Sequence, residues 1–204
     1  MVNKPKVVVV PGQELCKDIL SDRAKQTLES FAAPVWNEAE RPLNREELME
    51  RLPGAWGCIT SWGAPVFTKE VVAVADKLQI IGHAAGSVKQ LFYPAVFERG
   101  ITVVNAAATI ADSVAEFTLA AILSMLRDFH RYDRAIKAGE RWPTRQNIRE
   151  LYGKRVGIIS ASMVGRRVIR LLEPFHTHIL VYDPYLPAEQ AKALGVELAS
   201  LDEI

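Results

Sequence analysis

Short apolar stretches alternate with amphipathic helical segments along most of the 204 residues, and this alternation constrains the fold most. Val7–Val10 is a continuous β-branched run that Pro11-Gly12 ends, as in a strand buried on both faces. Similar stretches follow at regular intervals, at residues 34–36, 56–60, 78–82 and 101–105. This spacing predicts parallel strands with helices on both faces, and right-handed crossovers make a doubly wound sheet the default.

The segments between these strands have the period of helices. One helix is expected over Asp18–Phe31, a second begins at Asn44, and a third runs from Thr68 to Ala75. A longer amphipathic helix is expected from Asp112 or Ser113 to residue 138, since Glu116 supports such a start. The alternation then resumes, with strands expected at 155–159, 179–182 and 196–198 and helices at 165–172 and 189–194.

Composition excludes several classes of protein. The chain is 49% hydrophobic and 24% charged with a formal charge of +1, so it is an ordinary globular chain without the excess charge of a nucleic-acid or membrane-surface protein. Its longest uncharged apolar helical run, 117–126, is shorter than the roughly 20 residues that cross a bilayer. Cys16 and Cys58 match no metal or redox spacing, and the N-terminus has no signal-peptide pattern. We therefore expect a cytoplasmic protein without a metal site.

The segment 156–167 has the strand–turn–helix context of a dinucleotide-binding fingerprint. Amides at the start of such a helix face a pyrophosphate. Asp183, at the end of the next strand, would accept hydrogen bonds from the adenosine ribose and repel a 2′-phosphate, which favours NAD over NADP. An ordinary strand–helix turn followed by Asp-Pro explains the spacing equally well.

Two of the three fingerprint glycines are replaced by Ser160 and Ser162, and Gly165 alone keeps its place. Serine is small, and its hydroxyl can donate to a phosphate. A left-handed conformation at a non-glycine residue costs about 1–2 kcal/mol, which weakens binding without forbidding it.

Five ordered motifs resemble the D-isomer-specific 2-hydroxyacid dehydrogenase family, which includes phosphoglycerate, glycerate and formate dehydrogenases. The similarity covers nearly the whole chain. The motifs are Leu78-Gln-Ile-Ile-Gly-His-Ala-Ala-Gly-Ser-Val-Lys, Arg99-Gly-Ile-Thr-Val-Val-Asn-Ala, Ser113-Val-Ala-Glu-Phe-Thr-Leu, Gly153-Lys-Arg-Val-Gly-Ile-Ile and Val181-Tyr-Asp-Pro-Tyr-Leu.

The resemblance implies a flavodoxin-like substrate domain over residues 1–100 and an incomplete Rossmann NAD-binding domain over 101–204, with the active site in the cleft between them. The helix 113–138 corresponds to the region through which family members form homodimers. In such proteins backbone amides of one loop hold the substrate carboxylate, and a second turn and an acid hold NAD. The loop is Ala85, Gly86, Ser87 and Val88; the cofactor contacts are Ser160, Ser162, Met163, Val164, Gly165 and Asp183.

The family's catalytic arginine, glutamate and histidine have no matching position in this chain, because they follow the segment that corresponds to 201–204. His83 is interpreted as a satisfied polar group near the carboxylate loop, and His130 as a surface or interface residue. His176 and His178 lack a third ligand for a metal. We expect no catalytic residue on this chain.

The resemblance thus implies an NAD-dependent oxidoreductase that interconverts a 2-hydroxy acid and a 2-oxo acid. We expect the printed chain to be inactive alone, as a fragment or a prematurely ended reading frame of a longer dehydrogenase. The alternative is a non-catalytic module that senses NAD or binds a partner, because the same fold also serves binding without turnover.

A truncated sheet would leave apolar strand residues without neighbours. We expect Val156, Ile158, Ile159, Leu180 and Val181 to lie in such a sheet, with an open edge and an uncovered face.

Overall fold

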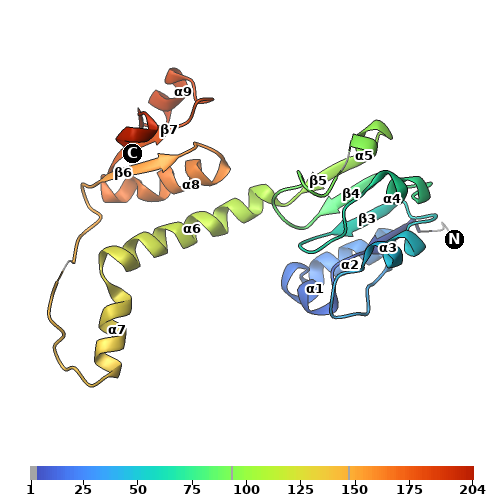
Figure 1. The fold of residues 1–204 in the computed structure, drawn as a ribbon, viewed down its shortest axis with the longest axis horizontal. Helices are drawn as coiled ribbons and strands as arrows, with labels where there is room; N and C mark the ends of the chain where they lie inside the picture. Colours follow the sequence, from blue (N-terminus) through green and yellow to red (C-terminus); the bar gives the residue numbers. More distant parts are fainter. Residues whose placement is uncertain (1–3, 93, 147) are drawn as a thin grey trace. The chain divides into compact units, whose positions relative to one another are not determined.

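The computed structural model describes residues 4–92, 94–146 and 148–204, and the chain divides into two compact units, Met1–Ala107 and Ala108–Ile204 (Figure 1). Both units consist of parallel strands connected by helices, which confirms the predicted α/β class. The elements of the first unit are β1 (Lys6–Val9), α1 (Gln13–Ile19), α2 (Asp22–Phe31), β2 (Ala33–Val35), α3 (Arg45–Arg51), β3 (Gly57–Thr60), α4 (Lys69–Val74), β4 (Ile80–His83), α5 (Pro94–Glu98) and β5 (Thr102–Asn105).

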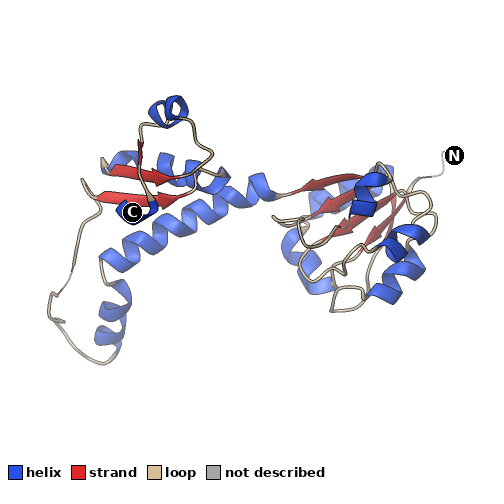
Figure 2. Ribbon diagram, turned by 45° about the horizontal axis from the view of Figure 1, so that its top comes forward, coloured by secondary structure: helices blue, strands red, loops and turns tan. Residues whose placement is uncertain are grey.

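The first unit has a five-stranded sheet in the order β2-β1-β3-β4-β5, which is the flavodoxin-like order. Figure 2 draws the strands in red and the helices in blue. The strand β5 pairs with β4, from Ile80↔Thr102 to His83↔Asn105. Residues 102–105 therefore lie in the first unit, whereas the expected boundary at residue 100 places them in the second.

The core of the first unit lies between its sheet and the helices α3, α4 and α5. Val8, Cys58 and Ile81 point into this core from the three central strands and are at most 1% exposed. Successive strand residues face opposite sides, so Val9 and Ile59 point to the face where α2 lies. Both cysteines of the chain are buried and free, and burial raises the pKa of the Cys58 thiol.

The second unit has a three-stranded sheet in the order β6-β7-β8, the order of the first three strands of a doubly wound sheet. Its core is formed by one side of α6, by α8 and by the sheet. The elements are α6 (Ala107–Leu126), α7 (Phe129–Lys137), β6 (Arg155–Ile159), α8 (Met163–Leu172), η1 (Glu173–Phe175), β7 (His178–Tyr182), α9 (Ala188–Ala193), β8 (Glu197–Leu198) and η2 (Leu201–Glu203).

The strand β6 is an edge strand, because β7 is its one partner among the described residues. Ile159 is 65% exposed, as expected for an apolar residue on an open edge. Leu180 and Val181 of the central strand β7 are buried, which differs from the expected uncovered face. The packing of α6 and α8 onto one face of the sheet explains the burial of Val181. Leu180 is not part of this core and points to the opposite face, because successive strand residues alternate.

Two expected helices are each divided in two. The helix expected over Asp18–Phe31 is interrupted after Ile19, because the Ser21 side chain accepts a hydrogen bond from the Ala24 amide and starts α2. The helix expected over 113–138 begins earlier, at Ala107, whose amide donates to the Asn105 side chain. It is interrupted at Asp128, which has the left-handed φ of 51°.

The helix α6 is long and apolar enough, by length and composition alone, to cross a membrane. The expectation of no such helix counted only the uncharged run 117–126 and is corrected here. One side of α6 packs onto the core of the second unit through Leu119, Ile122, Leu123 and Leu126.

Candidate functional site

The turn between β6 and α8 begins with a left-handed residue and leads directly into the helix. Ser160 has a left-handed φ of 76°, the conformation that the first fingerprint glycine adopts without strain. Its amide donates to the Tyr182 carbonyl at 2.7 Å, which ties the turn to the next strand. Ser162 then precedes α8 with extended backbone angles and no side-chain capping bond, so its hydroxyl is free of the helix.

At Gly165 the helix α8 packs closely against the preceding turn, which is the role of the third glycine of the fingerprint. A Cβ added at this position would lie 2.2 Å from the Ser160 carbonyl oxygen, far inside van der Waals contact. The helix α8 can therefore pack against the turn only because residue 165 is glycine.

Asp183 is hydrogen-bonded to this turn. Its Oδ2 accepts from the Ala161 amide at 2.8 Å and from the Ser160 hydroxyl at 3.3 Å, and its Oδ1 accepts from the Tyr185 amide at 2.9 Å. The Tyr185 amide lowers the pKa of the Asp183 carboxyl most, and loss of hydration opposes this shift; the Ala161 amide and the Ser160 hydroxyl lower the pKa further. Asp183 is therefore an ionised acceptor at neutral pH.

Sequence spacing places Asp183 near the turn but does not identify its donors. The amide of Ala161 carries no sequence signal, and it reaches Asp183 because β6 and β7 are paired in the register Ile159↔Tyr182. The amide of Tyr185 reaches Asp183 locally, two residues further along the same loop. The hydroxyl of Ser160, expected to be available to a phosphate, is directed to Asp183 instead.

The start of α8 presents amides without acceptors. The amides of Ser162, Met163 and Val164 donate to no described residue, as is usual in the first turn of a helix. These donors and the helix dipole favour an anion. Arg166 binds the Ala161 carbonyl through Nε at 2.8 Å, so a cation also lies beside the turn.

The loop expected to hold a carboxylate follows β4 in the first unit. Ala85 is buried and Ser87 is exposed. None of the amides of residues 85–88 donates to a residue that the structure describes. Gly86 has open space where a Cβ would stand. Free amides at the carboxyl end of a parallel strand suit an anionic group.

The four histidines have structural environments. His83 is 4% exposed, its Nδ1 lies 3.0 Å from the Thr60 hydroxyl, and burial lowers its pKa. His178 pairs with Glu197 across neighbouring strands, and His130 lies near Ser124 on the surface. The ring of His176 lies 5.2 Å from that of Tyr152, tilted by 60°. No group of metal-binding side chains occurs within the described ranges.

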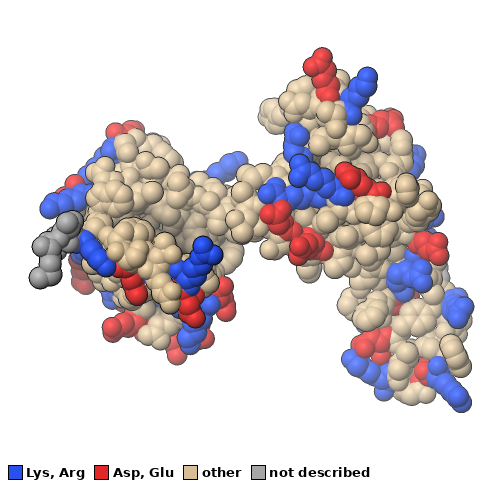
Figure 3. Space-filling model, turned by 180° about the vertical axis from the view of Figure 1, so that it is seen from behind, with Lys and Arg blue, Asp and Glu red and all other residues tan. Residues whose placement is uncertain are grey.

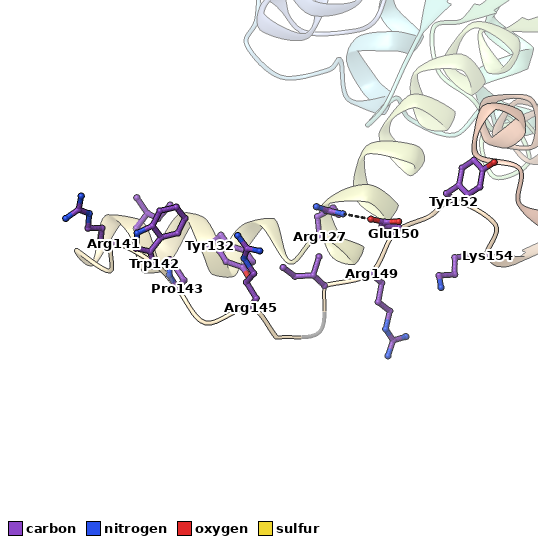
Figure 4. A pocket seen from close by; sticks show the side chains of 12 residues that line it. Arg127, Tyr132, Arg141, Trp142, Pro143, Arg145, Arg149, Glu150, Tyr152 and Lys154 are labelled. Atoms are coloured by element: carbon purple, nitrogen blue, oxygen red, sulfur yellow. Dashed lines mark ion pairs between the residues drawn. The ribbon is translucent and has the colours of Figure 1, made fainter.

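Charge is distributed without a dominant sign on the face drawn in Figure 3, where Lys and Arg lie among Asp and Glu. A cavity of about 960 Å³ lies between α7 and the segment that follows it (Figure 4). Arg127 and Glu150 form an ion pair there at 3.9 Å. The other basic residues of its lining are Arg141, Arg145, Arg149 and Lys154.

Comparisons with known proteins agree with this geometry. Residues 119–204 match the family model "D-isomer specific 2-hydroxyacid dehydrogenase, NAD binding domain". D-3-phosphoglycerate dehydrogenase of Methanocaldococcus jannaschii is 37% identical over 161 residues, which are 79% of this chain and 30% of the relative. The enzyme of the same name from Sus scrofa is 30% identical over 190 residues, 93% of this chain and 33% of the relative.

Among solved structures, a phosphoglycerate oxidoreductase from Rhizobium etli superposes with a TM-score of 0.75 at 27% identity, covering 98% of this chain and 62% of that one. The chain spans about a third of the length of the curated relatives it matches.

Proposed function

The chain belongs to the D-isomer specific 2-hydroxyacid dehydrogenase family. From this premise we propose that the protein functions as an NAD-dependent oxidoreductase. The reaction interconverts a D-2-hydroxy acid and its 2-oxo acid. One observation carries the proposal: Asp183 is held against a left-handed turn that opens onto the free amides of α8.

The residues present fit NAD. The amides of Met163 and Val164 and the Ser162 hydroxyl would hold the pyrophosphate, and Gly165 keeps the turn close to α8. Asp183 would accept a ribose hydroxyl, and its negative charge opposes the 2′-phosphate of NADP. Hydride transfer is the chemistry that a bound nicotinamide supplies.

The free amides of residues 85–88 support a second role, binding of the substrate carboxylate. In this proposal Gly86 and Ser87 orient the acid through their backbone. The side chain of Ser87 is exposed and is not required.

A homodimer is the assembly that we propose. Phe117, Met125, Phe129 and Ile136 are apolar residues of α6 and α7 that are each more than 60% exposed. Apolar groups this exposed on two consecutive helices are typical of a covered surface. Sedimentation of the purified chain over a range of concentrations tests this proposal. A monomer at every concentration would refute it.

The cofactor assignment is tested by titrating the chain with NADH and NADPH while nicotinamide fluorescence is recorded. We expect NADH to bind more tightly than NADPH. Asp183→Ala should weaken NADH binding about tenfold, as expected for the loss of a charged hydrogen bond, and remove the preference over NADPH. Asp202→Ala, an exposed acid outside the turn, is the control. Absence of NADH binding at millimolar concentration would refute the proposed function.

A further inference from the structure

We propose that Ser160 determines how many hydroxyls of an adenosine ribose this chain binds. Its hydroxyl occupies an acceptor position of Asp183 that the ribose would otherwise use, so that one ribose hydroxyl binds instead of two. The inference rests on the proposed function, because it concerns the same carboxylate.

The acceptor positions of Asp183 can be counted. A carboxylate offers about four, two on each oxygen. The Ala161 amide at 2.8 Å and the Ser160 hydroxyl at 3.3 Å fill both positions on Oδ2. The Tyr185 amide at 2.9 Å fills one position on Oδ1. Contacts with described residues thus leave one position, on Oδ1, and two neighbouring ribose hydroxyls would require one on each oxygen.

Ser160 is not needed to hold the carboxylate. The two backbone amides bind it at shorter distances than the hydroxyl does, and they remain in any variant at residue 160. A glycine at this position, as in the three-glycine fingerprint, would keep both amide bonds and leave Oδ2 with an open position. Ser160 is therefore a specificity-determining residue and not a structural tie.

The test uses calorimetric titration of the full chain with ADP, 2′-deoxy-ADP and 3′-deoxy-ADP. Each nucleotide carries the diphosphate and the adenosine, and the two deoxy forms each lack one ribose hydroxyl. We expect the wild-type chain to lose affinity on removal of at most one hydroxyl. Ser160→Ala should lose about threefold to tenfold on removal of either one, the value of one net hydrogen bond.

Ser160→Gly is the second variant, because alanine keeps the strained left-handed conformation and glycine relieves it. It should show the same pattern as Ser160→Ala. Ser162→Ala is the matched control, because Ser162 is not among the described residues that donate to Asp183. It should change the affinity for all three nucleotides by one common factor and keep the wild-type pattern.

The outcomes separate this inference from the proposed function. Equal patterns in the wild type and both Ser160 variants would overturn the inference while NADH binding stands. A wild-type chain that loses affinity equally with either deoxy nucleotide would also overturn it. If neither ADP nor NADH binds to any variant, the inference falls together with the proposed function.

Discussion

The two units form their candidate sites at the same kind of place, a turn after a parallel strand, but with different freedom. In the first unit, the loop 85–88 has free amides and open space beside Gly86. In the second unit, Gly165 is pressed against the Ser160 carbonyl, and three hydrogen bonds tie Asp183 to its surroundings. The first turn can adapt to a ligand, whereas the second is shaped before any ligand arrives.

This difference matches the ligands that we propose. A carboxylate is small and needs only a few convergent amides. A dinucleotide is large, and preorganised contacts reduce the entropy lost when it binds. A rigid turn is therefore more useful to the second unit than to the first.

The largest effect is expected from a substitution that disrupts the rigid turn of the second unit. Gly165→Ala places a Cβ 2.2 Å from the Ser160 carbonyl, so it should lower the free energy of unfolding of the second unit by about 3 kcal/mol and abolish NADH binding. Urea unfolding and NADH fluorescence measure the two effects.

Gly86→Ala is the matched variant in the adaptable turn. No atom lies within 4 Å of the added Cβ, and we expect a change in stability of no more than about 0.5 kcal/mol. A similar loss of stability in both glycine variants would contradict the contrast between the two turns.

A second prediction compares the capping boxes, one in each unit. Asn44 caps α3, and Ser200 caps η2 in the same way. Asn44→Ala should cost about 1 kcal/mol, because α3 contributes the fully buried Leu48 to the first core. Ser200→Ala should cost less than about 0.5 kcal/mol, because η2 buries no residue. Thermal unfolding of both variants tests the difference, and equal costs would contradict it.

The smallest expected effect concerns the pH dependence of the first unit. The Arg41 side chain most of all, and also the Asn44 amide, lower the pKa of Glu47 from 4.5 to about 2. Because the pKa of Glu47 is lowered in the folded state, its ionised carboxylate stabilises the fold above pH 4.5. This stabilisation is lost as the pH falls to about 2. Glu47→Gln should flatten this part of the stability profile, followed by melting temperature between pH 6 and pH 2. An unchanged profile would contradict the assignment.

The strands were predictable because apolar β-branched runs such as Val7–Val10 have few alternatives to a buried strand. The helix interruptions were not, because each depends on a local contact. Ser21 starts a new helix with its side chain, and Asp128 takes a left-handed conformation, within segments whose apolar period continues.

The candidate site shows the same limit. Gly165 was predictable from the fingerprint, since its role is set by the turn itself. The bond from Ser160 to Asp183 joins the residues that directly follow two strands, and it exists only because the strands pair in one register. The sequence pattern alone does not specify that strand register.

The burial of both cysteines has a practical consequence. The thiolate is the form of cysteine that attacks a thiol reagent. Cys58 combines complete burial with a raised pKa, and Cys16 is 7% exposed. A new cysteine on an exposed helix of each unit would therefore react first with a maleimide dye. Two such dyes would report, by energy transfer, the distance between the units in solution with and without NADH.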